Sequence, residues 1–138
     1  MGQNIVKYVN FEDVQYIVSN NFNNYIIINT LSSNEQNVLI KNTISIDNEV
    51  KIINNNLNKL TLKIIIYGKN DLDKKVEEKY NQLSSLGFTN IFIYRGGLFE
   101  WLLLQDIYGK DMFPTTKNEL DILKYKSKRL FNNNLLSN

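Results

Sequence analysis

Three short apolar runs constrain the fold of this chain more than any other feature of its sequence. They are Tyr-Ile-Ile-Ile-Asn at 25–29, Lys-Ile-Ile-Ile-Tyr at 63–67 and Asn-Ile-Phe-Ile-Tyr at 90–94. Each run is too short for a helix, rich in β-branched residues and apolar without alternation, which is typical of strands buried on both faces. Segments with helical spacing separate the runs. The order therefore predicts an α/β fold, with a mostly parallel sheet of about five strands and helices on both faces.

Helical periodicity predicts four helices, at 11–18, at 49–60, from Asp71 or Asp73 to about residue 86, and at 98–107. The last is apolar nearly all round, so we expect it to be largely buried. Gly87 suits the left-handed position after the third helix, and Gly109 ends the fourth. The apolar faces consist of Phe11, Val14, Ile17 and Val18 in the first helix, Val50, Ile53 and Leu57 in the second, Leu72, Val76, Tyr80, Leu83 and Leu86 in the third, and Leu98, Phe99, Trp101, Leu102, Leu103, Leu104 and Ile107 in the fourth.

The remaining segments are less regular. Residues 38–40 and 43–46 indicate a short strand pair or a strand with a turn. Beyond Pro114 we expect one more short helix that packs on the domain through Leu120, Ile122, Leu123 and Tyr125. The chain is expected to form a single domain at 1–127, with a core at about 10–107, a C-terminal extension at 108–127 and a flexible tail at 128–138.

Composition excludes several classes of function. The 138 residues include neither cysteine nor histidine. Thiolate nucleophiles, Cys/His zinc sites and Ser-His-Asp triads therefore cannot be built from this chain, and acid–base work would fall to Asp, Glu, Lys or Tyr. The net charge of +2 argues against a nucleic-acid partner. An excess of asparagine and isoleucine, with no alanine, indicates an AT-rich genome.

The N-terminus leaves one question of location open. No apolar run approaches the roughly 20 residues of a membrane span, and no secretory signal is visible, so we expect a cytoplasmic protein. Gly2 follows the initiator Met, as N-myristoylation requires, but Val6 stands where that motif has Ser or Thr. Gly2 is either a lipid acceptor or a glycine without that role. Peripheral attachment to a membrane is expected only if it is myristoylated.

The segment between residues 83 and 101 has the most specific motif of the sequence. A helix ends in Leu-x-x-Leu-Gly-Phe at 83–88, the strand at 90–94 follows, and Gly96-Gly97 is separated by three residues from Trp101. This order resembles the closing signature of the rhodanese-like domain. Upstream, 25–31 is similar to the first core strand of that family and 39–44 to its "HI.GAI" segment. The resemblance covers roughly residues 10–107 and implies the rhodanese-like α/β fold.

Departures from the family pattern bear on function. The resemblance assigns the family's nucleophilic cysteine to the position of Gly68, its usual aspartate to Asn29, an arginine to Leu31 and a histidine to Leu39. A persulfide carrier without its sulfur cannot turn over, and the cysteine-dependent phosphatases of this fold are excluded for the same reason. The resemblance therefore implies a pseudoenzyme.

The loop after the strand at 63–67 is the first candidate site. It consists of Gly68, Lys69, Asn70, Asp71, Leu72 and Asp73. Its place between a strand and a helix start would suit weak anion binding, with Lys69 adding charge. The structural alternative is a tight turn at Gly68 with aspartates that cap the helix. The least favoured interpretation is that Asp71 and Asp73 form a catalytic or cation-binding pair.

Two further surfaces are candidates for contact with a partner. Tyr108, Met112 and Phe113 either fold back onto the domain or face a partner. Trp101 is expected in the core rather than in an interface. The basic end of the chain is either solvated or in contact with an acidic protein or anionic lipid. It consists of Lys124, Lys126, Lys128 and Arg129.

These observations favour a non-catalytic rhodanese-like domain that serves as an interaction or scaffold module. No cofactor and no metal are expected, and the expected partner is another protein. The alternative is a relative of the rhodanese or phosphatase enzymes with altered chemistry or weak anion binding at residues 68–73.

Overall fold

A five-stranded parallel sheet forms the centre of the computed structural model, which describes residues 5–20 and 22–131. The strand order is β1-β5-β4-β2-β3, and every pairing is parallel. The strands are β1 (Lys7–Val9), β2 (Tyr25–Asn29), β3 (Thr43–Ile44), β4 (Lys63–Tyr67) and β5 (Asn90–Tyr94). The three predicted central strands are confirmed with their bounds, whereas β1 was not predicted.

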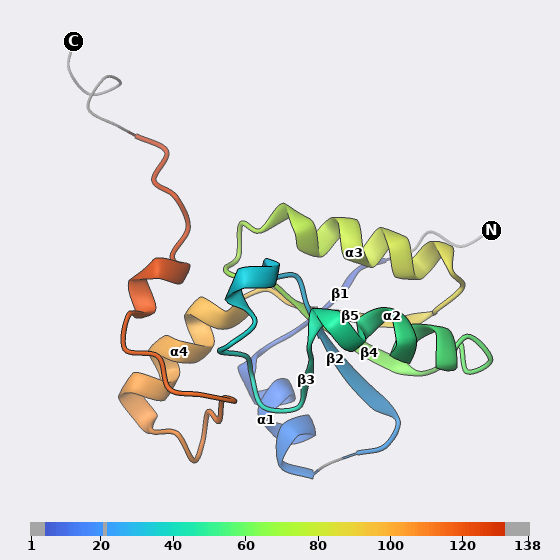
Figure 1. The fold of residues 1–138 in the computed structure, drawn as a ribbon, viewed down its shortest axis with the longest axis horizontal. Helices are drawn as coiled ribbons and strands as arrows, with labels where there is room; N and C mark the ends of the chain where they lie inside the picture. Colours follow the sequence, from blue (N-terminus) through green and yellow to red (C-terminus); the bar gives the residue numbers. More distant parts are fainter. Residues whose placement is uncertain (1–4, 21, 132–138) are drawn as a thin grey trace.

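Four helices cover the two faces of this sheet (Figure 1). Helices α1 (Phe11–Asn20) and α4 (Gly97–Tyr108) lie on one face, and α2 (Ile46–Asn55) and α3 (Lys74–Ser85) lie on the other. The 3-10 helix η1 (Ser33–Glu35) follows β2, and the 3-10 helix η2 (Ile122–Tyr125) precedes the C-terminal segment. The predicted arrangement of helices on both faces is confirmed.

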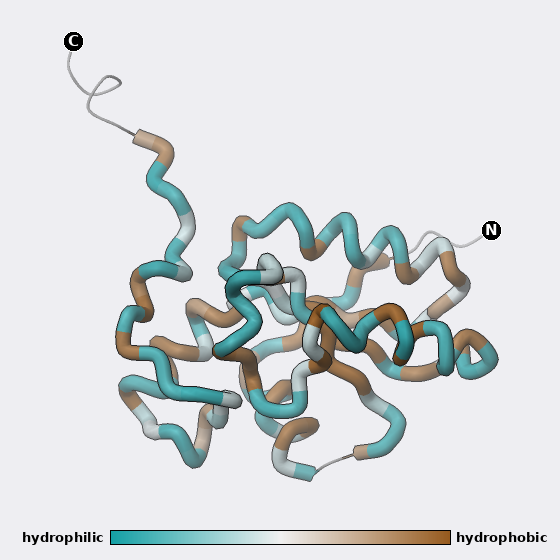
Figure 2. Tube along the Cα trace, viewed as in Figure 1, coloured by the Kyte–Doolittle hydropathy of each residue, from teal (hydrophilic) through white to brown (hydrophobic). Residues whose placement is uncertain are grey.

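Each face of the sheet has its own apolar core, because successive side chains of a strand point to opposite sides. In β4, Ile65 and Tyr67 pack with α1 and α4, while Ile64 and Ile66 pack with α2 and α3. The central strands are among the most apolar segments of the chain (Figure 2). Two-sided burial accounts for the continuous apolar runs of the sequence.

The second helix differs from its prediction. It begins at Ile46 rather than at 49, and it presents Glu49 and Ile53 to the core. Val50 and Leu57 are exposed, so the predicted apolar face was correct only at Ile53. The helix ends at Asn55 rather than at 60, so Leu57 lies beyond it. The buried carboxylate of Glu49 forms an ion pair with the ammonium of Lys79 on α3. Residues 38–40 form no strand pair, and Ile40 makes a single antiparallel bridge to Thr115.

The predicted apolar faces of α3 and α4 were too wide. Leu72 precedes α3, which begins after Asp73, and both Leu72 and Leu86 are exposed. On α4, Leu103 and Ile107 are exposed although Leu98, Trp101 and Leu102 are buried. An apolar composition on all sides therefore does not bury this helix completely, because only one of its faces meets the sheet.

The segment after α4 folds back onto the domain. Phe113 is 1% exposed and stacks edge-on against Trp101, with ring centroids 5.0 Å apart. Tyr125 is buried as predicted, whereas Leu120 and Leu123 are exposed, so the predicted packing of the last short helix was only partly correct. Gly2 and residues 132–138 lie outside the described residues.

Candidate functional site

The carboxyl ends of β2 and β4 meet at one edge of the sheet, where ligands of open α/β sheets usually bind. A hollow of about 540 Å³ lies there, and we refer to it as the carboxyl-end hollow. It is lined by residues 30–32, Glu35, residues 69–70 and 72–75, and residues 126–128. The structure thus places most of the candidate loop in one concave site.

Gly68, the first residue of this loop, is buried among side chains that leave no room for one of its own. A Cβ at this position would lie 2.5 Å from Oδ2 of Asp73, 2.7 Å from Cγ2 of Val76 and 2.8 Å from Oγ1 of Thr30. Real Cβ atoms essentially never approach other atoms within 3.0 Å. The position that the resemblance assigns to a nucleophilic cysteine therefore cannot accept any side chain without rearrangement.

The Asp73 carboxylate fills the space beside Gly68. Its Oδ2 accepts hydrogen bonds from the backbone N–H of Lys69 and from Oγ1 of Thr30, both at 3.1 Å. Its Oδ1 accepts from the N–H of Lys75 at 3.0 Å and caps α3. The predicted cap is confirmed at Asp73. An anion at this loop would have to compete with a carboxylate that already binds two of the N–H groups it needs.

Asn70 makes three further hydrogen bonds at this loop. Its Oδ1 accepts from the N–H of Leu72 at 3.0 Å, and its backbone carbonyl accepts from the N–H of Asp73. Its Nδ2 donates to the carbonyl of Tyr125 at 2.9 Å. This bond joins the loop to η2 and fixes the C-terminal segment at the rim of the hollow.

The Gly-Gly pair brings α4 close to the same loop. Leu98 and Phe99 donate their N–H groups to the carbonyls of Gly68 and Lys69, at 2.9 and 3.0 Å. Gly97 has a φ of +68°, and a Cβ there would lie 2.7 Å from the carbonyl oxygen of Gly68. A glycine is needed at this position for both reasons.

Lys69 is held by an ion pair at the edge of the hollow. Its ammonium lies 2.8 Å from Oε2 of Glu35, and Ser32 also donates to Glu35. Partial burial opposes ionisation of Glu35, but the hydrogen bonds from Lys69 and Ser32 outweigh it and lower the pKa of the carboxyl. The ammonium of Lys69 is therefore already paired with a carboxylate.

The other positions that depart from the family pattern are also structural. Asn29 is buried, and its amide exchanges hydrogen bonds with the amide of Gln36 and accepts one from the N–H of Leu31. Leu31 and Leu39 lie in the apolar core. Gln36 was not predicted, because only the fold brings its amide against Asn29.

No acid–base pair is assembled at the loop. Asp71 is exposed and lies on another groove, while Asp73 is occupied by its backbone bonds. Burial raises the pKa of the Tyr67 hydroxyl, and burial together with a hydrogen bond to Glu100 raises that of Tyr94. Both tyrosines are anchored to the protein rather than aimed into the hollow.

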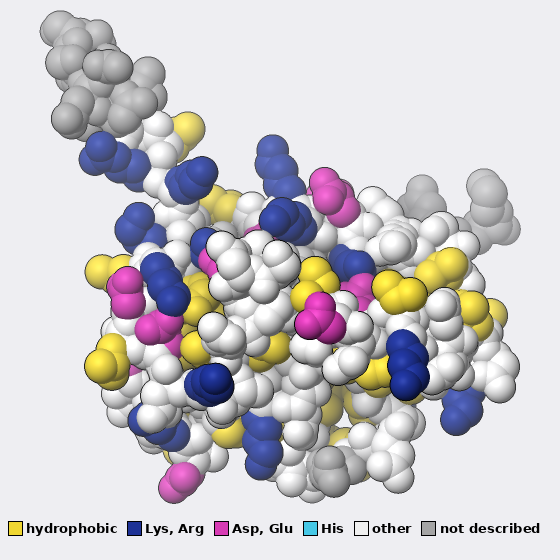
Figure 3. Space-filling view, in the orientation of Figure 1, with side chains coloured by type: hydrophobic (Ala, Val, Ile, Leu, Met, Phe, Trp, Pro, Cys, Tyr) yellow, Lys and Arg dark blue, Asp and Glu magenta, His cyan; other side chains and the backbone are white. Residues whose placement is uncertain are grey.

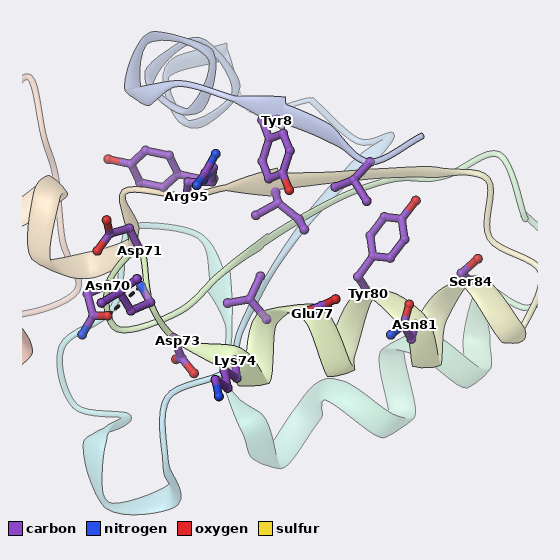
Figure 4. Close-up of a pocket in the computed structure, with 15 residues that line it drawn as sticks. Tyr8, Asn70, Asp71, Asp73, Lys74, Glu77, Tyr80, Asn81, Ser84 and Arg95 are labelled. Carbon is purple, nitrogen blue, oxygen red and sulfur yellow. Dashed lines mark hydrogen bonds between the residues drawn. The ribbon is translucent and has the colours of Figure 1, made fainter. Parts of the chain in front are cut away.

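A second groove, of about 490 Å³, lies between β1 and α3 (Figure 4). Tyr8 and Arg95 line one side and Tyr80 the other, and the Arg95 guanidinium lies 5.0 Å from the centre of the Tyr8 ring. Sequence reasoning missed this groove because β1 itself was not predicted.

The predicted contact surface is divided by the fold. Phe113 is buried, which is a correction, whereas Tyr108 and Met112 are exposed. Trp101 lies in the core, as predicted, and donates to the carbonyl of Pro114 at 3.1 Å. Among residues 5–20 and 22–131, three or more carboxylates nowhere gather as a metal site would require. In the same part of the chain, no helix has the length and apolarity needed to cross a membrane.

Comparison with solved structures identifies the fold. The Saccharomyces cerevisiae protein Ygr203w, a homolog of single-domain rhodanese and the Cdc25 phosphatase catalytic domain, superposes with a TM-score of 0.62 at 16% identity, over 88% of this chain and 96% of that one. The Saccharomyces cerevisiae single-domain sulfurtransferase RDL2 gives a TM-score of 0.61 at 16% identity, over 83% and 100% of the two chains. The rhodanese-like domain of Alr3790 from Anabaena sp. gives 0.59 at 18% identity, over 93% and 91%.

These similarities show that the chain has the rhodanese-like fold, which confirms the fold implied by the sequence resemblance. No protein-family model matches the chain. A search of curated proteins also found no match. At these levels of sequence identity the similarity shows the fold and does not show the activity.

Proposed function

We propose that this chain is a non-catalytic domain of the rhodanese-like fold that acts by binding another protein. The observation that carries the proposal is the closure of the loop after β4. Gly68 has no side chain and no room for one, and the Asp73 carboxylate fills the adjacent space. Position 68 therefore offers neither a nucleophile nor room for one.

The activities named for the structural neighbours support this proposal, because they need a nucleophile that this chain lacks. One of them is a sulfurtransferase and another is described as a protein tyrosine phosphatase of the rhodanese family. Covalent sulfur or phosphoryl transfer of that kind uses a thiolate nucleophile. The 138 residues contain no cysteine to supply one.

The alternative, altered chemistry or weak anion binding at residues 68–73, requires more rearrangement. An anion at the loop would have to displace Asp73 from the N–H groups of Lys69 and Lys75. The displaced carboxylate would remain nearby and repel the ligand. We therefore prefer protein binding, and a cytoplasmic location is part of the proposal.

Two assays test the loss of catalysis. The purified chain is incubated with thiosulfate and cyanide, and thiocyanate is measured; hydrolysis of p-nitrophenyl phosphate is measured in parallel. The yeast sulfurtransferase RDL2 serves as the positive control for sulfur transfer. We expect neither product above the rate in buffer. Turnover that disappears in Asp73→Asn would contradict the proposal and favour altered chemistry at the loop.

Binding requires its own test. The tagged chain is cross-linked in the cells that produce it, the attached protein is identified, and the complex is rebuilt from purified components. A saturable complex of defined stoichiometry supports an interaction module. If no captured protein forms such a complex with the purified chain, the binding part of the proposal fails even where the activity assays are negative.

A further inference from the structure

The carboxyl-end hollow carries an excess of positive charge. Five of its lining side chains are lysines, at positions 69, 74, 75, 126 and 128, and its two carboxylates are Glu35 and Asp73. Glu35 is paired with Lys69, and Asp73 accepts from backbone N–H groups and a hydroxyl. Across the described residues, no ion pair joins the other four lysines to a carboxylate.

These four lysines come from two segments of the chain that both line the hollow. Lys74 and Lys75 begin α3, whereas Lys126 and Lys128 follow η2. Figure 3 shows Lys and Arg side chains gathered over the start of α3 and over the segment after η2. All four are exposed, so their ammonium groups are available to a ligand.

A hydrogen bond joins the loop before α3 to the end of η2. Asn70 binds the carbonyl of Tyr125, whose own side chain is 1% exposed in the core. The residues just beyond Tyr125 are therefore held beside the loop that begins α3. Such preorganisation reduces the entropy that a ligand must overcome on binding.

We propose that the carboxyl-end hollow binds an acidic segment of a partner protein, a run of Asp or Glu side chains in an extended chain. The inference rests on the proposed function and names the surface and the kind of partner. Charge complementarity carries it, because five lysines and two carboxylates line the hollow and four of the lysines form no ion pair among the described residues. Leu72, which is 66% exposed on the rim, adds one apolar contact.

The shape of the site favours a protein segment over a lipid surface. The lysines of two chain segments line a hollow, whereas a membrane presents its charge on a broad, flat surface. A chain in extended conformation can enter such a hollow and place successive carboxylates against both segments.

The experiment compares two variants of equal net charge by fluorescence anisotropy, with a fluorescein-labelled octaglutamate peptide as the probe. Phosphatidylserine vesicles test the lipid alternative. All the substituted side chains are exposed, so both variants should retain the thermal stability of the parent. The hollow variant carries Lys74→Gln, Lys75→Gln, Lys126→Gln and Lys128→Gln. The control variant carries Lys41→Gln, Lys51→Gln, Lys59→Gln and Lys110→Gln, none of which lines the hollow.

We expect the peptide to bind the parent with an affinity that falls as salt is added. Several exposed ion pairs of a few tenths of a kcal/mol each predict that Kd rises roughly tenfold in the hollow variant. In the control variant Kd should change about twofold or less. Equal losses in the two variants would reduce the effect to net charge and overturn the proposal.

Absence of peptide binding to the parent would also overturn it. So would binding to vesicles, but not to the peptide, that is lost in the hollow variant, because the ligand would then be a lipid surface. These failures leave the proposed function standing, since they say nothing about catalysis or about binding through another face. Sulfur transfer or phosphatase activity would remove the proposed function itself.

Discussion

Substitution of Gly68 by alanine tests whether the loop after β4 is as closed as its geometry indicates. The added Cβ would lie 2.5 Å from Oδ2 of Asp73, 2.7 Å from Val76 and 2.8 Å from Thr30. Over-packing of this kind costs about 1–3 kcal/mol. If Asp73 is pushed away, the loss of its helix cap adds about 1 kcal/mol.

We therefore expect Gly68→Ala to lower the free energy of unfolding by about 3 kcal/mol, or the Tm of a chain of this length by about 10 °C. The assay is urea unfolding followed by far-UV circular dichroism. Lys41→Ala, at an exposed position that lines no part of this loop, is the control. Its expected cost is below about 0.5 kcal/mol.

A double-mutant cycle identifies the clash. In an Asp73→Ala background the closest contact at position 68 is absent, so Gly68→Ala should cost about 1 kcal/mol less than in the parent. Additive effects would refute the reasoning, because they would mean that the carboxylate of Asp73 does not fill the space beside Gly68. A cost below about 0.5 kcal/mol for Gly68→Ala alone would refute it as well.

Three further outcomes follow from the same geometry. Gly97→Ala should lower the free energy of unfolding by about 3 kcal/mol in urea, because it adds both a clash with a loop carbonyl and left-handed strain. Trp101→Phe should cost about 2 kcal/mol, since it removes a buried indole N–H donor and leaves a void, whereas Trp101 in the parent should emit at the short wavelengths of a buried indole. The pKa of Glu35 is lowered by Lys69 and Ser32, so its contribution to stability is present above pH 4.5, the ordinary glutamate pKa, and is lost as pH falls through the folded value. NMR titration of the Glu35 carboxyl should show this lowered pKa, and Lys69→Met should return it towards 4.5.

The sheet could be predicted from the sequence because its central strands are local signals. Burial on both faces forces a continuous apolar run, and each run matched its strand residue for residue. β1 gives no such signal, because Lys7 and Tyr8 are exposed at the edge of the sheet. Its existence depends on pairing with β5, which is distant in sequence.

The site could be predicted only in part, for the same physical reason. A helix cap is a local pattern, and the sequence predicted one at Asp71 or Asp73, of which Asp73 is the cap in the structure. Its bond to Thr30 joins the start of α3 to the end of β2, 43 residues earlier in the sequence, so no spacing rule could reveal that the carboxylate fills the loop. Likewise, Lys126 lines the hollow because tertiary contacts, among them the bond from Asn70 to the carbonyl of Tyr125, bring the end of η2 to the loop.

The most direct test of the central claim is an NMR titration of the backbone amides of residues 69–75 with thiosulfate and with phosphate. The Asp73 carboxylate closes this loop, and the N–H groups of Lys69 and Lys75 are already bound to it. We therefore expect no saturable shift of either amide at millimolar ligand. A saturable shift centred on Lys69 and Lys75 would show that the loop still accepts an anion, and it would contradict the account.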